Sequence, residues 1–183
     1  SLKVTTTDGT EYDASVVGKD SQTDLAVIKV DANNLQAATL GDSDILQVGD
    51  PAIAIGNPLG ELGGTVTTGI ISATDRQITI DDETMTLLQT DAAINPGNSG
   101  GGLFNADGNL IGIVNAKESS TGIEGLGFAI PITPAQDIIT ELMQNGSVTS
   151  RPALNVSLYD YTSNNQGQYS KYKDGCYIVQ IVK

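Results

Sequence analysis

Short apolar runs alternate with turn-forming residues along the first 150 positions of the chain. The first run, residues 2–7, alternates apolar and polar side chains and leads into Asp8-Gly9, a dipeptide typical of β-hairpin turns. Strands separated by turns at intervals of roughly ten residues are the pattern of an all-β barrel or sandwich. We therefore predict further strands at residues 12–17, 26–30, 52–55, 69–73, 77–80, 85–89, 102–104, 110–115 and 127–130.

One segment departs from this pattern and has helical periodicity. Apolar residues recur at a spacing of about three to four positions between 138 and 142. Thr133 is a good N-cap residue, and Pro134 directly after it suits the first helical position. Asn145-Gly146 is a typical helix end, because glycine readily adopts the left-handed conformation there. We expect a helix between these signals.

The composition indicates a globular domain and limits its partners. Of 183 residues, 39% are hydrophobic, which is enough for a packed core. A net charge of −13 excludes nucleic acid as a partner, since phosphate binding needs clustered lysine and arginine. A single cysteine, Cys176, excludes a disulfide framework and a cysteine zinc site. The acidic runs at 42–44 and 81–83 lack the ligand spacing of a calcium loop, so we expect no metal and no cofactor.

Residues 97–101, Gly-Asn-Ser-Gly-Gly, are a setting typical of a nucleophilic serine. An isolated copy of this string would as readily be a tight turn, since glycine, asparagine and serine are common turn residues. A serine hydroxyl normally needs a neighbouring base to take its proton. The chain contains no histidine, the usual base. The residue types therefore indicate a hydrolase, while the base that a hydrolase normally uses is missing.

The longer string at residues 90–101, Thr-Asp-Ala-Ala-Ile-Asn-Pro-Gly-Asn-Ser-Gly-Gly, resembles the nucleophile loop of the HtrA (DegP-like) family of trypsin-fold serine proteases. Further segments resemble this family in the same order, so that the resemblance spans about residues 2 to 145. The resemblance implies an all-β fold: a trypsin-like double β-barrel with an incomplete first barrel, a complete second barrel and one C-terminal helix. The further segments lie at residues 22–29, 41–44, 48–50, 54–60, 66–73 and 127–131.

The resemblance implies a role for each residue around the serine. Ser99 would be the catalytic nucleophile, and Asp24 would be the catalytic aspartate, buried and orienting the imidazole of the base. The amides of Gly97 and Ser99 would form the oxyanion hole, with help from the amide of Asn98. Without the resemblance, Asp24 would be an ordinary turn carboxylate in front of a strand.

The resemblance also places the walls of the substrate pocket. Ile94 and Asn95 precede the serine, and Val114, Asn115 and Ala116 follow it at the end of the second strand after it. The apolar members of this set, and the lack of an acidic residue just before the serine, indicate a small or medium aliphatic P1 side chain. Selectivity between such side chains should be modest. For Val114 a plain core position is an open alternative.

Two basic residues have candidate roles. Arg76 falls where relatives place an arginine in a regulatory loop that helps to switch the oxyanion loop into its active shape. An exposed arginine at a hairpin is the alternative. Lys117 is a conceivable base for a Ser-Lys dyad, but nothing in the sequence makes it buried, so we expect an exposed lysine.

By resemblance, the chain begins after the strands that carry the family histidine, so on its own we expect it to be inactive. The missing strands would leave the first barrel open, and its free edges should be covered by another copy or rearranged. The end of the chain is similar to the opening of a PDZ domain. We expect the remainder of the first barrel at residues 1–50, the second barrel and helix at 51–146, a linker at 147–152 and a truncated PDZ start at 153–183.

The resemblance implies a serine endopeptidase that cleaves unfolded or damaged polypeptides through an acyl-enzyme on Ser99, in protein quality control. The resemblance implies homo-oligomers built from trimers. It also implies a location outside the cytoplasm, in the periplasm or at the cell surface, as part of the bacterial cell envelope. Contact with a membrane would come only through an N-terminal anchor missing from this chain. The alternative is a non-catalytic pseudoprotease that binds misfolded polypeptides as a chaperone does.

Overall fold

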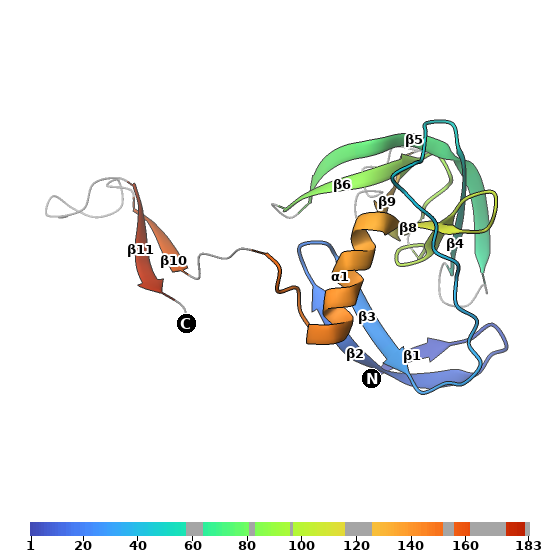
Figure 1. Ribbon diagram of the computed structural model, residues 1–183, viewed down its shortest axis with the longest axis horizontal. Helices are drawn as coiled ribbons and strands as arrows, with labels where there is room; N and C mark the ends of the chain where they lie inside the picture. Colours follow the sequence, from blue (N-terminus) through green and yellow to red (C-terminus); the bar gives the residue numbers. More distant parts are fainter. Residues whose placement is uncertain are drawn as a thin grey trace, which may run out of the picture. The chain divides into compact units, whose positions relative to one another are not determined.

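The computed structural model describes residues 1–57, 64–80, 83–95, 97–115, 126–151, 156–161 and 175–181. These residues fall into two compact units, Ser1–Thr149 and Ser150–Lys183. The first unit holds a three-stranded sheet, a closed barrel and one helix, and the second holds a two-stranded sheet (Figure 1). Within the described ranges, no helix is both long enough and apolar enough to cross a membrane.

An open antiparallel sheet forms the N-terminal part of the first unit. The predicted Asp8-Gly9 turn joins its first two strands: Gly9 has a φ of 83°, and its amide donates to the Thr6 carbonyl (2.9 Å). The Thr6 hydroxyl and the Thr10 amide both donate to the Asp8 carboxylate and thereby lower the pKa of Asp8. In sheet order the strands are β1 (Leu2–Thr5), β2 (Glu11–Asp20) and β3 (Leu25–Val30).

A closed antiparallel barrel follows along the chain. Each of its strands pairs with a neighbour on both sides, so the barrel has no free edge. Small and aliphatic side chains fill its interior, among them Ala52, Ile71, Leu103 and Ile111. In the order in which they pair, the strands are β4 (Pro51–Gly56), β5 (Thr65–Ile80), β6 (Glu83–Thr90), β9 (Gly127–Pro131), β8 (Leu110–Asn115) and β7 (Gly102–Phe104).

Strand β5 corrects one prediction, since it is a single strand of 16 residues where two strands were expected. The polar residues between 72 and 76 have the composition of a turn. The pairing with β6 nevertheless continues past them, with register shifts between Ile71 and Ala73 and between Ala73 and Arg76. A β-bulge inserts extra residues into one strand without ending the ladder, and it bends that strand. The polar stretch therefore bends β5 instead of breaking it.

Helix α1 (Ile132–Asn145) begins earlier than its sequence signals indicate, because its N-cap position is Pro131 rather than Thr133. The capping hydrogen bond comes from another segment: the Thr133 amide donates to the Ser43 hydroxyl (3.0 Å), and the Ser43 amide donates to the Thr133 hydroxyl (2.8 Å). At the other end, Gly146 has a φ of 75° and its amide donates to the Leu142 carbonyl (3.0 Å). The predicted C-terminus is therefore confirmed.

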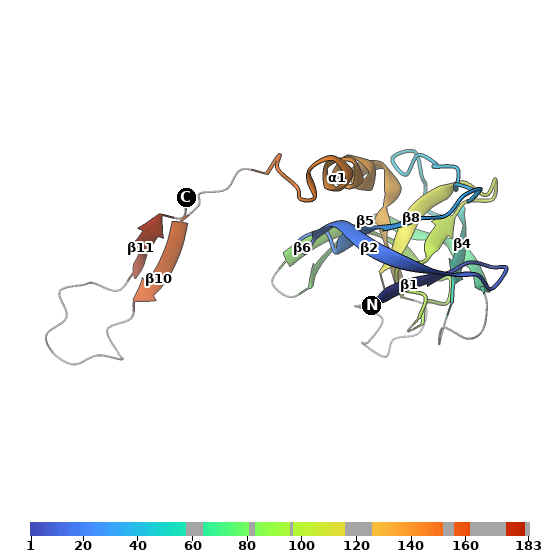
Figure 2. The same ribbon diagram turned by 90° about the horizontal axis from the view of Figure 1, so that it is seen from below.

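Helix α1 packs against both the open sheet and the barrel (Figure 2). Its buried Leu142 shares a core cluster with Leu25 of β3 and Leu87 of β6. The end of the helix packs directly against the backbone of β2 at Gly18. A Cβ at this position would lie 2.8 Å from the carbonyl oxygens of Leu142 and Gly146, so a side chain has no room there. The helix thus fixes the open sheet relative to the barrel.

The second unit is an antiparallel pair of strands, β10 (Val156–Tyr161) and β11 (Gly175–Ile181). A register shift lies between Ser157 and Leu158. The boundary between the two units falls after Thr149, inside the segment expected as a linker. The assignment of residues 153–183 to a PDZ domain stays a prediction.

Replacing Gly18 by alanine should lower the free energy of unfolding by about 1–3 kcal/mol, because the added Cβ pushes the helix end off β2. Chemical denaturation followed by circular dichroism would measure it. Ser15→Ala, an exposed position on the same strand, is the control and should change stability by less than about 0.5 kcal/mol. Equal stability of the two variants would mean that the helix end does not rest on β2.

Candidate active site

Ser99 lies on an exposed turn of the barrel between β6 and β7. Two backbone hydrogen bonds hold this turn to β8: the Gly100 amide donates to the Val114 carbonyl (2.9 Å), and the Val114 amide donates to the Gly101 carbonyl (2.8 Å). The Ser99 turn is therefore attached to a strand that is itself paired on both sides. An exposed hydroxyl on a fixed backbone is a suitable arrangement for a nucleophile.

The glycines around Ser99 are required for two different reasons. Gly97 and Gly100 have φ values of 103° and 81°, in the left-handed region that L side chains rarely adopt. Gly101 is required by close approach, since a Cβ there would lie 2.3 Å from the Ile55 carbonyl oxygen. The backbone on both sides of the serine therefore requires glycine.

Asn98 is buried beneath the turn, with 1% of its surface exposed. Its amide donates to the Asn95 carbonyl (3.0 Å), and its side-chain Nδ2 donates to the Ala93 carbonyl (3.3 Å). The Asn98 N–H is thus used inside the turn, and its help in an oxyanion hole stays a prediction. Its Oδ1 is buried and has no hydrogen-bond partner among the described residues.

Gly56, at the end of β4, provides the space for Asn98. A Cβ at Gly56 would lie 2.5 Å from the Asn98 Oδ1 and 2.7 Å from its Cα. The sequence analysis placed Gly56 only within the family-like segment 54–60, because a close approach of two distant segments leaves no local signal. The structure shows that position 56 has to be glycine for the nucleophile turn to lie where it does.

Asp24 ends the turn between β2 and β3 and has a φ of 56°, a conformation that aspartate tolerates better than most residues. Its side chain is exposed, which corrects the expectation of a buried aspartate. Among the described strands, no fourth strand pairs with the open sheet of β1, β2 and β3 that carries this turn. The Asp24 Oδ2 accepts a hydrogen bond from Nδ2 of Asn115 (3.3 Å), which ends β8.

The predicted pocket walls fall into different environments. Ile94 is half-buried and packs on the barrel core, whereas Asn95 is exposed. Val114 is a core residue with 2% exposure. The structure therefore supports the alternative of a plain core position for this residue. Asn115 is also buried, and its carboxamide contacts Asp24. Ala116 lies outside the described residues.

Gly127 on β9 is a neighbour of the pocket that the sequence analysis missed. A Cβ at this position would lie 2.5 Å from Cγ1 of Ile94, so the Ile94 side chain rests directly on the glycine. Next to it, the Ala93 carbonyl accepts a hydrogen bond from the Thr67 hydroxyl (2.9 Å) as well as from Asn98. Both contacts restrict the segment that leads into the nucleophile turn.

Arg76 lies within β5, opposite Leu87 of β6, and not on a loop. This corrects the expected location, because the bulged strand continues through the residues that had the composition of a turn. The Arg76 Nε donates to Oε1 of Gln89 (2.9 Å), a buried side chain with 8% exposure. The regulatory role of Arg76 stays a prediction, and Lys117 lies outside the described residues.

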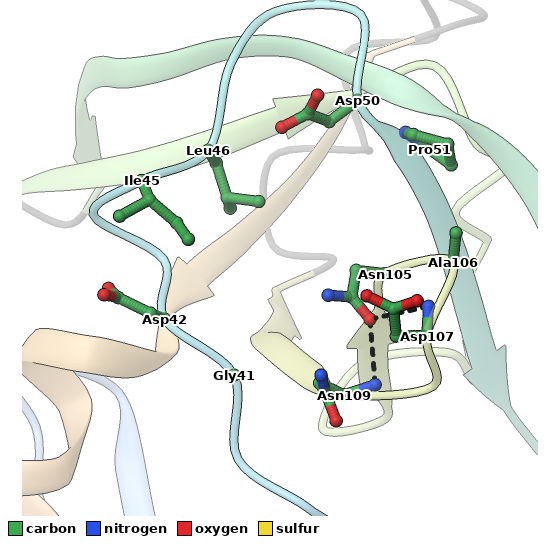
Figure 3. A pocket seen from close by; sticks show the side chains of 10 residues that line it. All are labelled: Gly41, Asp42, Ile45, Leu46, Asp50, Pro51, Asn105, Ala106, Asp107 and Asn109. Atoms are coloured by element: carbon green, nitrogen blue, oxygen red, sulfur yellow. Dashed lines mark hydrogen bonds between the residues drawn. The ribbon is translucent and has the colours of Figure 1, made fainter.

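A separate pocket of about 350 Å³ lies between residues 41–51 and the turn from β7 to β8 (Figure 3). Its lining combines three aspartates and two asparagines with aliphatic side chains. Asp50 accepts a hydrogen bond from the Gln47 amide (2.8 Å), and Asn105 accepts one each from the Asp107 and Asn109 amides. None of the candidate active-site residues lines this pocket, and no group of metal-ligating side chains was found in the described part of the chain.

A closed barrel, an open sheet beside it and a glycine-bounded serine turn define the class of trypsin-like peptidase domains. A family model described as "Trypsin-like peptidase domain" matches residues 1–113. The chain belongs to the HtrA/DegP-like serine proteases within this class. The predictions of family and of fold class are therefore confirmed.

The relatives match most of this chain, but the chain covers only part of each relative. The chain is 50% identical over 165 residues to the serine protease Do-like HtrB of Bacillus subtilis (strain 168), covering 87% of this chain and 36% of that protein. It is 48% identical over 184 residues to a probable periplasmic serine endoprotease DegP-like of Chlamydia muridarum, covering 100% of this chain and 37% of that protein. The chain thus spans little more than a third of these two relatives.

A solved structure extends the comparison to three dimensions. The HtrA-type protease AlgW with decapeptide superposes with a TM-score of 0.77 at 44% identity. The match covers 99% of this chain and 56% of that one.

Replacing Gly56 by alanine should destabilise the chain by about 1–3 kcal/mol and increase hydrogen exchange at the Gly101 amide, because the new Cβ displaces Asn98. Hydrogen exchange followed by NMR or mass spectrometry would measure the second effect. The neighbouring, exposed Asn57 provides the control Asn57→Ala, which should leave both quantities unchanged. Normal protection of Gly101 in Gly56→Ala would contradict the dependence of the turn on this glycine.

Proposed function

We propose that this chain carries the nucleophile, the catalytic aspartate and the oxyanion loop of an HtrA-type serine endopeptidase that cleaves unfolded or damaged polypeptides. The observation that carries the proposal is that the end of β8 contacts both key elements: Val114 pairs with the Ser99 turn, and the next residue, Asn115, contacts Asp24. Family membership supports the same reading.

The proposed reaction is acyl transfer. The Ser99 hydroxyl attacks the carbonyl carbon of the scissile peptide bond while a base takes its proton, and the base then returns the proton to the leaving amine. The amides of Gly97 and Ser99 stabilise the oxygen of the tetrahedral intermediate, and loss of one such donor costs roughly 3–4 kcal/mol. Water hydrolyses the resulting ester on Ser99 in a second, similar step.

The base in this proposal is an imidazole that Asp24 orients. The 183 residues contain no histidine, so an imidazole has to reach the site from outside them, and we expect this chain alone to be inactive. Asp24 accepts the Asn115 hydrogen bond at one carboxylate oxygen, Oδ2. An ionised carboxylate has lone pairs for further donors, including an imidazole N–H.

The proposed substrate is a polypeptide with a small or medium aliphatic P1 side chain. Ile94, resting on Gly127, presents an apolar surface beside the nucleophile turn. A difference of one methylene in such a pocket is worth about 1–3 kcal/mol, so several aliphatic residues should be accepted. The structure of AlgW with a decapeptide supports a peptide ligand, with Asn95, Asn115 and Ala116 as further candidate walls.

For the longer protein we propose a homo-oligomer built from trimers and a location outside the cytoplasm. The location is supported by relatives named as probable periplasmic proteases. We also propose the domain division expected from the sequence: first-barrel strands at residues 1–50, second barrel and helix at 51–146, a linker at 147–152 and the start of a PDZ domain at 153–183. Arg76 is the proposed regulatory residue.

A second candidate function is a non-catalytic binder of misfolded polypeptides. The lack of histidine favours it, since a binder needs no general base. The two functions differ in what happens at Ser99: a protease site reacts with an electrophile once a base is supplied, whereas a binding surface does not.

The test is covalent labelling of the 183-residue chain by a fluorophosphonate, with and without imidazole in solution, followed by intact-mass measurement. We expect a mass increase of one phosphonyl group on the wild type, accelerated by imidazole, and none on Ser99→Ala. No adduct on the wild type at any imidazole concentration would support the binder. Equal labelling of Ser99→Ala would place the reactive residue elsewhere.

A further inference from the structure

The segment that leads from β6 toward the Ser99 turn, residues 91–94, lies on β5 without a backbone ladder. Thr90 is the last residue of β6 that pairs with β5, opposite Ile71. The preceding β5 residues, 65–70, pair with β4 on one edge. Among the described residues, no backbone–backbone hydrogen bond joins the 91–94 segment to the other edge. Something other than strand pairing therefore holds this segment in place.

Side chains replace the missing ladder at Ile70. Its amide donates to Oδ1 of Asp91 (2.7 Å), and its carbonyl accepts a hydrogen bond from the Thr90 hydroxyl (2.8 Å). The same hydroxyl accepts a hydrogen bond from the Ala92 amide (3.1 Å). Both backbone groups of Ile70 are thus bound by the two residues at the point where the chain leaves β6.

The Asp91 carboxylate lies directly against the backbone of β5. A Cβ at Gly69 would overlap both Oδ1 of Asp91 and the amide nitrogen of Ala92, so the close approach requires glycine at this position. Of the bonds that hold the segment, the one to Asp91 has a carboxylate as its acceptor. Such a bond is stronger than one between neutral groups at neutral pH. The contact with Asp91 therefore determines how closely the segment approaches β5.

The position of Ile94 depends on this approach. Ala92, directly after Asp91, is buried in the barrel core with 1% exposure, and Ile94 packs against the same cluster. Between them, the Ala93 carbonyl accepts a hydrogen bond from the Thr67 hydroxyl of β5 (2.9 Å). A short stretch held at each residue has little freedom to adjust, so a shift at residue 91 moves Ile94 as well.

We propose that Asp91 is a positioning residue that sets which P1 side chains the site accepts. By accepting the Ile70 amide, it holds the 91–94 segment on β5 and thereby fixes the Ile94 wall of the pocket. This inference rests on the proposed function, because it assigns Asp91 to the P1 pocket beside Ser99. The sequence analysis contained Asp91 only within the family-like string 90–101, since its partner Ile70 is 21 positions away.

The test compares two peptidyl diphenyl phosphonates that differ only in their P1 side chain, valine or phenylalanine. The Ser99 hydroxyl attacks the phosphorus, imidazole in solution takes the proton, and phenoxide leaves. Intact mass followed over time gives the labelling rate of the 183-residue chain with each reagent. The ratio of the two rates measures P1 selectivity, and we expect the wild type to prefer valine.

Asp91→Ala should reduce this preference by about five-fold, less than the ten-fold or more that one methylene is worth in a well-fitted pocket. Asp91→Asn keeps an oxygen acceptor for the Ile70 amide, so it should restore the ratio to within about two-fold of the wild type. Asp107→Ala, an exposed aspartate on another turn of the same barrel, is the matched control and should leave the ratio unchanged.

Two NMR readouts are independent of the reaction. The Ile70 amide should lose protection from hydrogen exchange in Asp91→Ala and keep it in Asp91→Asn. The Ile71 amide, which donates to the Asp50 carbonyl (2.8 Å), should stay protected in both variants and reports that the barrel is folded. The methyl signals of Ile94 should move in Asp91→Ala and stay in place in Asp107→Ala.

An unchanged rate ratio in Asp91→Ala, or an equal fall of both rates, would overturn the inference while leaving the proposed function intact. Unmoved Ile94 methyl signals would overturn it as well. Lost protection of Ile71 in Asp91→Ala would show that Asp91 stabilises the whole barrel, which contradicts a role confined to the pocket. Absence of imidazole-dependent labelling of the wild type by both reagents would instead refute the proposed function, and with it the role of Asp91 in selectivity.

Discussion

The pairing of the Ser99 turn with β8 is the constraint on which the rest of the site depends. A turn rich in glycine and asparagine has many accessible conformations and would lose considerable entropy on becoming ordered. The barrel supplies that order, because β8 is paired on both sides and extends its ladder to Gly100 and Gly101. Freeing the turn would expose backbone groups that the closed barrel otherwise satisfies. Site residues on loops held by a rigid scaffold are a common arrangement in enzymes.

The open sheet is held to the barrel by other contacts than backbone pairing. Its residues contact the barrel through side chains and through helix α1. Leu25 of β3 joins the cluster beneath the helix, and Gly18 of β2 receives the end of the helix. Asp24 lies directly before Leu25 in the sequence. Burial of Leu25 thus fixes the backbone next to Asp24, whose carboxylate accepts the hydrogen bond from Asn115 of the barrel.

Features encoded by local pattern could be predicted from the sequence, and features that depend on distant contacts could not. The alternating runs located most strands, and the glycines located the turn around Ser99, because period and turn chemistry are local. The helix start was misplaced because its capping partner, Ser43, lies 90 residues away from Thr133. The close approaches at Gly56 and Gly127 were missed for the same reason. The exposure of Asp24 was mispredicted because burial depends on what packs over a turn, not on the turn itself.

The reciprocal hydrogen bonds between Ser43 and Thr133 have a topological consequence. The chain reaches the barrel soon after Ser43 and leaves it just before Thr133, so these bonds bring the two ends of a 90-residue segment together at one point. The segment that forms the barrel therefore begins and ends at the same place. Domains whose two ends lie close together can be inserted into another protein. The turn that carries Ser99 lies within this segment, whereas Asp24 lies in the part of the chain that precedes it.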